Sequence, residues 1–256
     1  MDTLATLATT TIFNSFYLNV MLSVMYMSLV ASEPFISHTF SDKVKGNGSF
    51  QCVVKAYNGF QIGFNAYIVW LIFQGYATTP SDGTIVGEME RWLGLSQTEI
   101  TWQVQTFQLY HIAKYLDWVD TIIIVMKKSK RQLSWLHCVH HVIMPWPWYL
   151  TFVHFPQAMI LYTWQNAMNS LVHVMMYGYY LVNPMYPVIA KYKLLLTEFQ
   201  LFQFWSCVVV ALWSMTKPDF HWFGWFCYMA MSALMIQMFG SFYKKEKKKP
   251  GQVTIC

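Results

Sequence analysis

The sequence predicts an all-α integral membrane protein built from seven transmembrane helices. Charged residues make up only 11% of its 256 residues, against about 25% in ordinary soluble domains. Hydrophobic residues reach 55%, aromatic residues 18%, and the mean hydropathy is +0.32. So few charges cannot cover the surface of a soluble domain, and disordered chains need a polar composition that is absent here. We therefore expect one transmembrane domain over residues 1–256, with a flexible tail at 244–256.

Seven segments are apolar over about the 20 residues that a helix needs to cross a bilayer. They comprise residues 11–31, 57–77, 102–126, 133–151, 157–182, 194–215 and 222–243. Pro145 and Pro147 are expected to kink or break the fourth segment, since proline has no amide proton to donate. Between the spans, residues 34–56 and 78–101 are expected to form the two longest loops.

The lysine and arginine residues orient these spans. If the chain crosses the membrane at each of the seven spans, 14 of these 17 residues lie on one side of the membrane and two lie on the other. Because positive residues accumulate in cytosolic loops, the N-terminus is expected to be lumenal or external and the C-terminus cytosolic. Asn47, in the sequon Asn47-Gly48-Ser49, then lies on the cytosolic side and should carry no glycan. The basic residues cluster between apolar runs, which argues against a nucleic-acid surface despite the net charge of +5.

Ionisable residues inside the third span are the first candidates for chemistry, because charges in a bilayer are costly and usually functional. This span carries Lys114, Asp117, Asp120 and Thr121. Spacings of three and four place Lys114, Asp117 and Thr121 on one helical face, and Lys114 can pair with Asp117. The pair is either a structural bridge between helices or part of a polar pocket beside neighbouring histidines.

The fourth span carries three histidines, His137, His140 and His141, within five residues. On a helix they lie within roughly 100° of one another. Two chemistries suit such a cluster. Histidine is the commonest metal ligand, and a neutral imidazole can also act as a nucleophile or a general base.

The fifth and sixth spans carry polar stripes at helical spacing. Asn166, Asn169, His173, Tyr177 and Tyr180 follow one another in steps of three and four on the fifth span. The sixth span repeats the pattern with Thr197, Gln200 and Gln203, one turn after Lys193. Polar residues inside otherwise apolar helices indicate a polar-headed, apolar-walled tunnel with a basic cytosolic mouth. A molecule with an anionic head and a long apolar tail, such as an acyl-CoA, suits that field.

Five segments, in order along the chain, resemble the motifs of the membrane-bound very-long-chain fatty acid elongases. Tyr57-Asn58 with Gln61 resembles YNxxQ, residues 114–121 (KYLDWVDT) resemble KxxExxDT, and residues 132–141 (QLSWLHCVHH) resemble QxxFLHxYHH. Residues 169–177 (NSLVHVMMY) resemble NxxVHxxMY, and residues 197–204 (TEFQLFQF) resemble TxxQxxQF. Asp117 replaces the usual Glu, Val139 replaces the usual Tyr, and the chain's last residues lack the dilysine signal common in the family.

The resemblance implies a condensing enzyme that extends a long-chain fatty acyl-CoA with malonyl-CoA to give 3-ketoacyl-CoA, CO2 and CoA. It also implies a seven-helix fold in which six helices surround the acyl-chain tunnel, in the endoplasmic reticulum membrane. No cofactor and no metal are expected beside the two CoA substrates. The other partners would be the bilayer and other enzymes of the elongation cycle, and a homodimer is left open.

The family motifs also imply roles for individual residues. His140 would attack the acyl thioester and hold the acyl group as an acyl-imidazole. His137, His141 and His173 would orient it, move protons and stabilise negative charge, with Asp120 and Lys114 in support. The residues expected to bind substrate are Asp117, Thr121, Lys127, Lys128, Arg131, Gln132, Asn169, Tyr177, Lys191, Lys193, Gln200 and Gln203.

Two other classes of protein compete with this interpretation. A di-iron membrane desaturase or hydroxylase also carries an HxxHH box, but His38, His154 and His221 fall in expected loops or at span ends and form no second box. A non-enzymatic seven-helix receptor or transporter could use Lys114, Asp117 and Asp120 as an ion path. That class leaves the histidine cluster unexplained.

Overall fold

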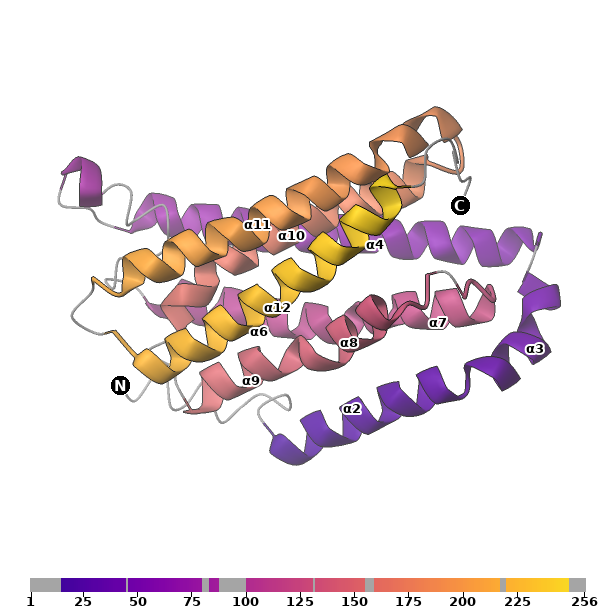
Figure 1. Cartoon of the computed structure of the whole chain (residues 1–256), viewed down its shortest axis with the longest axis horizontal. Helices are drawn as coiled ribbons and strands as arrows, with labels where there is room; N and C mark the ends of the chain where they lie inside the picture. Colours follow the sequence, from indigo (N-terminus) through magenta and orange to yellow (C-terminus); the bar gives the residue numbers. More distant parts are fainter. Residues whose placement is uncertain are drawn as a thin grey trace. The chain divides into compact units, whose positions relative to one another are not determined.

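The computed structural model describes residues 15–44, 46–79, 83–87, 100–130, 132–154, 159–216 and 220–248, and the regular structure in these ranges is helical. Figure 1 shows the helices. They are α2 (Phe16–Ala31), α3 (Glu33–Val44), α4 (Gly48–Thr78), α6 (Ile100–Leu116), α7 (Trp118–Met126), α8 (Trp135–Ile143), α9 (Pro145–His154), α10 (Met159–Val182), the 3-10 helix η3 (Pro187–Tyr192), α11 (Lys193–Ser214) and α12 (Trp222–Lys247).

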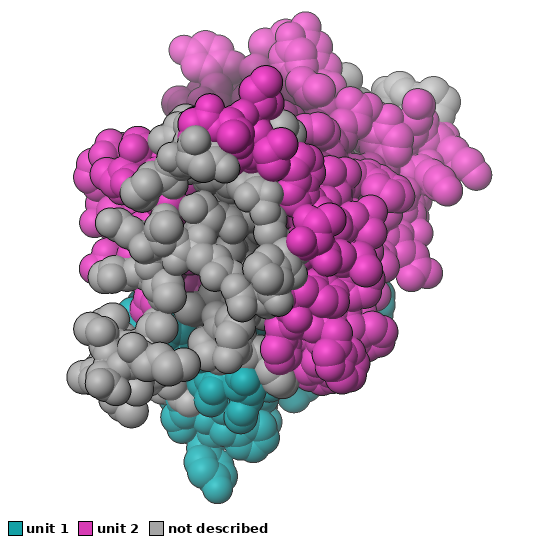
Figure 2. Space-filling view, turned by 90° about the vertical axis from the view of Figure 1, so that its left-hand side faces the viewer, with its two compact units in different colours: residues 1–57, 108–154 teal, residues 58–107, 155–256 magenta. Residues whose placement is uncertain are grey.

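The chain forms two compact units, coloured separately in Figure 2. Unit 1 comprises residues 1–57 and 108–154, and unit 2 comprises residues 58–107 and 155–256. Of the three boundaries between the interleaved segments, two fall inside a helix, α4 and α6, and the third follows the end of α9 at His154. The prediction of a single domain over residues 1–256 stays a prediction.

In unit 1, α2 packs against α7, α8 and α9, and α3 packs against α7. The indole of Trp146 donates to the Ser23 hydroxyl at 3.1 Å, and the Tyr115 hydroxyl donates to the Asn19 side chain. Asn19, Ser23 and Tyr26, all on one face of α2, are its buried residues. Polar groups on the buried face of an apolar helix therefore find partners on neighbouring helices, as they must where water is excluded.

In unit 2, α11 packs against both α10 and α12. The Lys193 ammonium at the start of α11 lies 2.8 Å from the Glu246 carboxylate at the end of α12, and Trp225 near the start of α12 donates to the Ala211 carbonyl at 2.9 Å. The two helices are therefore antiparallel, side by side (Figure 1). The same holds for α10 and α11, where Trp164 donates to the Ser206 hydroxyl at 2.9 Å.

The described parts of all seven predicted spans are mainly helical, which confirms the all-α class. Two helical segments, Pro187–Ser214 and Trp222–Lys247, are long and apolar enough to cross a membrane. Helices α2 and α3, bent by 64° at Ser32, meet the same criterion when taken together. The number of crossings among the described residues is thus two or three by this measure, and the seven-span count and the tunnel stay predictions.

The expected loop at residues 34–56 is wrong, since α3 occupies most of its first half and α4 begins at Gly48. Apolar content does not reveal α3, because its buried face consists of Ser37, Ser41 and Val44. His38 accordingly lies within a helix, where it is exposed. The side chain of Asn47 accepts the amide proton of Phe50 at 3.0 Å and so caps the start of α4. Most of the other expected loop, residues 78–101, lies outside the described residues.

The break predicted in the fourth span is confirmed. Helix α8 ends at Ile143 and α9 begins at Pro145. The first amide protons of a helix have no acceptor within that helix. Proline, which lacks an amide proton, is therefore tolerated in the first turn.

Gly75 on α4 lies directly against the Trp102 side chain of α6. A Cβ on Gly75 would overlap the Trp102 ring, whereas one on Gly63, in the same helix, meets no described atom within 4 Å. We expect Gly75→Ala to lower stability by about 1–3 kcal/mol through overpacking. Gly63→Ala, the matched control, should be neutral or stabilising by up to about 1 kcal/mol. Thermal unfolding of both variants in detergent checks this, and equal melting temperatures would contradict the close approach.

The cytosolic placement of Asn47 is tested by glycosylation. Asn47 is exposed and caps a helix, so accessibility alone would not prevent its modification. We expect no mobility shift on glycosidase treatment of protein made in eukaryotic cells, whereas a sequon added to the N-terminus should give one. A glycan on Asn47 would reverse the predicted orientation.

Candidate active site

Three imidazoles pack against one another on α8, in unit 1. The ring centroids of His137 and His141 are 4.2 Å apart, and those of His140 and His141 are 5.2 Å apart with the rings nearly perpendicular. His141 is buried, while His137 and His140 are half-buried. The Ser134 hydroxyl caps α8 by accepting the amide proton of His137 at 3.2 Å. This cap starts the helix three residues before the first imidazole and so fixes the register of the cluster.

Helix α7 holds the imidazole cluster from the side. The hydroxyl oxygen of Thr121 lies 2.8 Å from Nε2 of His137, and the Trp118 indole donates to the His141 carbonyl at 2.9 Å. The Tyr26 hydroxyl, from α2, lies 3.2 Å from the Thr121 hydroxyl. The side chains of Tyr26 and Thr121 are buried. Thr121 was expected to bind substrate, and the structure gives it a histidine partner.

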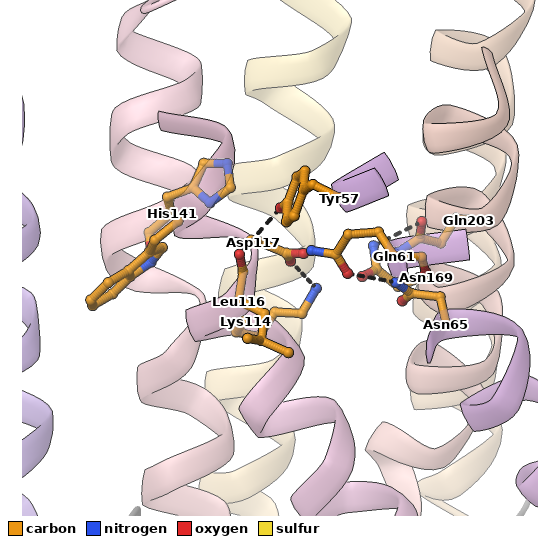
Figure 3. Close-up of polar contacts among 10 residues, drawn as sticks. Tyr57, Gln61, Asn65, Lys114, Leu116, Asp117, His141, Asn169 and Gln203 are labelled. Atoms are coloured by element: carbon orange, nitrogen blue, oxygen red, sulfur yellow. Dashed lines mark hydrogen bonds and ion pairs between the residues drawn. The ribbon is translucent and has the colours of Figure 1, made fainter. Parts of the chain in front are cut away.

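The expected Lys114–Asp117 pair is present, with 2.9 Å between Nζ and Oδ2 (Figure 3). Both residues are buried, with exposed fractions of 2% and 1%. The ammonium also lies 4.4 Å from the centroid of the Tyr110 ring. A buried charge needs this kind of compensation, since its hydration is lost.

The helix breaks at Asp117, which the sequence did not predict. Helix α6 ends at Leu116 and α7 begins at Trp118. The Tyr57 hydroxyl donates to the Leu116 carbonyl at 3.2 Å, which satisfies one acceptor at the break (Figure 3). Asp120 follows in the first turn of α7, where it is half-buried.

The polar stripe predicted on the fifth span is buried along most of α10, in unit 2. Asn166, Asn169, His173 and Tyr177 are all buried, whereas Tyr180 is 42% exposed. The Asn169 amide donates to the Gln203 side-chain oxygen on α11 at 3.3 Å (Figure 3). This bond joins the predicted stripes of the two helices, and Thr197 on α11 is buried as well.

A third polar stripe, on α4, was not among the predicted site residues. Asn58, Gln61 and Asn65 are buried at steps of three and four, and the Asn65 amide donates to the Gln61 carbonyl at 2.9 Å. Figure 3 shows Gln61 and Asn65 beside each other on this helix. The same periodicity that identified the stripe on the fifth span would have found it.

The other residues expected to bind substrate differ in their surroundings. Lys128 is exposed, with a φ of 53°, and Lys191 is exposed as well. Lys127 lies over the Phe50 ring at 5.9 Å from its centroid. Lys193 is paired with Glu246, so its charge is already balanced. Gln132 and Gln200 are half-buried, and Arg131 lies outside the described residues.

Among the described residues, no three His, Cys, Asp or Glu side chains are grouped so that they could hold a metal ion. The free thiols of Cys52, Cys138, Cys207 and Cys227 form no disulfide within that part of the chain.

Residues 11–254 match the family model described as the ELO: GNS1/SUR4 family. The chain belongs to this family. Among its curated relatives, very long chain fatty acid elongase 7 of Rattus norvegicus is 42% identical over 104 residues, which cover 40% of this chain and 36% of the relative. Fatty acid elongase 6 of Leishmania major is 32% identical over 127 residues, covering 46% and 32%. Very long chain fatty acid elongase 7 of Drosophila melanogaster is 33% identical over 144 residues, covering 53% and 42%.

These alignments span about a third to two fifths of the relatives' own lengths. The ELO family match itself runs through both units, so the histidine cluster of α8 and the stripe of α10 both fall within it.

The buried pair generates a stability prediction. Lys114→Met leaves the Asp117 carboxylate buried without its nearest cation, which should cost about 3–5 kcal/mol. The double variant Lys114→Met/Asp117→Leu removes both charges and should recover much of that loss. Lys193→Met, the control, breaks the partly exposed pair with Glu246 and should cost about 1 kcal/mol or less. Melting temperatures in one detergent check the order, and a single Lys114 variant as stable as the control would contradict it.

Proposed function

We propose that this ELO family member condenses malonyl-CoA with a long-chain fatty acyl-CoA, giving 3-ketoacyl-CoA, CO2 and CoA. Family membership supports a role in fatty acid elongation. The packed cluster of His137, His140 and His141 carries the proposal further, because it offers a nitrogen nucleophile with two imidazole neighbours. An acyl carrier of this kind needs no cofactor beyond the two CoA substrates.

His140 is the proposed nucleophile. Nε2 of His137 already contacts the Thr121 hydroxyl, and His141 is buried between its two neighbours. His140 is half-buried, and its ring centroid lies 5.2 Å from that of His141. A neutral His140 nitrogen attacks the thioester carbonyl, a carbon–nitrogen bond forms, the carbon–sulfur bond breaks, and CoA leaves as the thiol after taking up a proton.

The second half-reaction makes the new carbon–carbon bond. The bond between C2 of malonyl-CoA and its free carboxylate breaks, and CO2 departs. The electron pair left on C2 attacks the acyl carbon, and the acyl–nitrogen bond breaks to return its electron pair to His140. The net reaction consumes one proton, and the imidazole is regenerated.

The remaining predicted residues are proposed to support these steps. His137 and His141 donate hydrogen bonds where negative charge develops, an effect worth about 3–4 kcal/mol for one well-placed donor. His173, Asn169 and Gln203 of unit 2 are proposed to handle protons and hold substrate. Lys127, Lys128 and Lys191 are proposed to attract the CoA phosphates. The reaction is proposed to take place in the endoplasmic reticulum membrane, with the basic side cytosolic.

The proposed function is tested with purified protein, an acyl-CoA panel and malonyl-CoA labelled in its free carboxylate. Wild type should release labelled CO2 and form the matching 3-ketoacyl-CoA. His140→Ala should lower turnover by about a thousandfold or more, because no other residue replaces the nucleophile. His38→Ala, at an exposed position of α3, is the matched control and should keep full turnover.

The melting temperature of the His140 variant must match that of wild type, so that loss of turnover reports chemistry and not unfolding. Near-normal turnover of His140→Ala would contradict the choice of nucleophile. Formation of a desaturated or hydroxylated acyl-CoA in place of the 3-ketoacyl product would contradict the proposed reaction class.

A further inference from the structure

Three side chains from three helices of unit 1 form a hydrogen-bonded series. The Tyr26 hydroxyl on α2 lies 3.2 Å from the Thr121 hydroxyl on α7, which lies 2.8 Å from Nε2 of His137 on α8. Tyr26 is 3% exposed and Thr121 is fully buried. Tyr26 belongs to none of the five motif segments, and nothing in the sequence distinguishes it from the neighbouring aromatic residues of α2.

The number of available protons decides which group donates and which accepts in each hydrogen bond of this series. Each hydroxyl has a single proton, and Thr121 is the one hydrogen-bond partner of the Tyr26 hydroxyl within the described part of the chain. If Tyr26 donates to Thr121, then Thr121 is free to donate its own proton to Nε2 of His137. Both hydroxyl protons of the series then have an acceptor. Nε2 acts as an acceptor, so neutral His137 carries its proton on Nδ1.

The opposite direction leaves a buried proton without an acceptor. If Nε2 of His137 carried the proton and donated to Thr121, Thr121 would either donate to Tyr26 or accept from it as well. The first case leaves the phenol proton, and the second the Thr121 proton, without an acceptor among the described residues. An unsatisfied donor in a water-excluded site is strongly disfavoured. The phenol of Tyr26 therefore determines which atoms donate and which accept along the series.

We propose that Tyr26 is a positioning residue that acts through Thr121 to hold His137 as the Nδ1–H tautomer. For the proposed function, on which this consequence rests, His137 is then a hydrogen-bond donor and not a nucleophile. The hydroxyl series thereby gives two neighbouring histidines of one helix different roles: His137 stabilises developing negative charge, and His140 forms the acyl bond. Helix α2, outside the five motif segments, becomes part of the catalytic apparatus.

Tyr26 also has a packing role that the test must separate from its hydroxyl. Its ring lies 4.9 Å from the Trp118 ring, between centroids. Tyr26→Phe keeps this contact and removes only the oxygen. Thr121→Val keeps the side-chain shape and removes the hydroxyl, whereas Thr121→Ser retains it. Tyr17→Phe is the matched control, because Tyr17 lies on the same helix and is 83% exposed.

The first measurement reads the tautomer itself. Protein labelled with 15N in its histidine rings is studied by NMR in detergent micelles, and the His137 signals are assigned by their loss in His137→Gln. Wild type and Tyr17→Phe should show a protonated Nδ1 and an unprotonated Nε2. Tyr26→Phe should show a mixture of tautomers. A protonated Nε2 in wild type, or an unchanged tautomer in Tyr26→Phe, would overturn the proposal.

The second measurement is a double-mutant cycle on turnover. Tyr26→Phe should lower kcat about fivefold and Thr121→Val about tenfold or more, with little change in KM, while Thr121→Ser stays within about threefold of wild type. Since Tyr26 acts only through Thr121, the double variant should be no slower than Thr121→Val alone. Independent, multiplicative losses would overturn the series, because a packing defect at each site would produce them.

The two measurements separate this inference from the proposed function. The tautomer is observed without substrate, so it stands even if wild type forms no 3-ketoacyl-CoA. In that case the proposed function fails while the Tyr26–Thr121–His137 series is retained. If wild type is active but the tautomer is insensitive to Tyr26, the series fails and the condensation chemistry is retained.

Discussion

Polar side chains buried in apolar helices must find their partners inside the protein, and this constraint explains much of the structure. Where water is excluded, an unpaired polar group costs several kcal/mol. Lys114 pairs with Asp117, and Asn169 binds Gln203 on the next helix. A contact between helices, such as that of Asn169 with Gln203, adds a directional constraint to close packing, because a hydrogen bond tolerates only a narrow range of distances and angles. The site is therefore built from the same contacts that hold the helices together.

The same constraint gives the three imidazoles of α8 different surroundings. They belong to one helix and one residue type, but each has a different environment. His137 contacts a hydroxyl, His141 is buried and packs against both other rings, and His140 is half-buried beside His141. Chemistry that needs a nucleophile and separate donors requires such differences. Neighbouring helices create these differences, because each supplies a polar group to a particular histidine.

Much of this arrangement could be predicted from the sequence, because it follows from local spacing. Hydropathy located most of the helices, Pro145 located the break between α8 and α9, and a spacing of three predicted the Lys114–Asp117 pair. Helix α3 was missed because serines form most of its buried face. Tyr26 was missed because its role depends on a partner 95 positions away, and a contact between distant segments leaves no local pattern. The break at Asp117 has the same origin, since a tyrosine from α4 supports it.

In the proposed reaction a nitrogen on α8, and not a sulfur or oxygen elsewhere, carries the acyl group. Purified protein incubated with acyl-CoA alone, without malonyl-CoA, should gain the mass of one acyl chain. Peptide fragmentation should then place that mass on His140, and addition of malonyl-CoA should discharge it as 3-ketoacyl-CoA. An acyl group on the neighbouring Cys138, or a labelled 3-ketoacyl product formed with no covalent adduct at any time, would contradict the account.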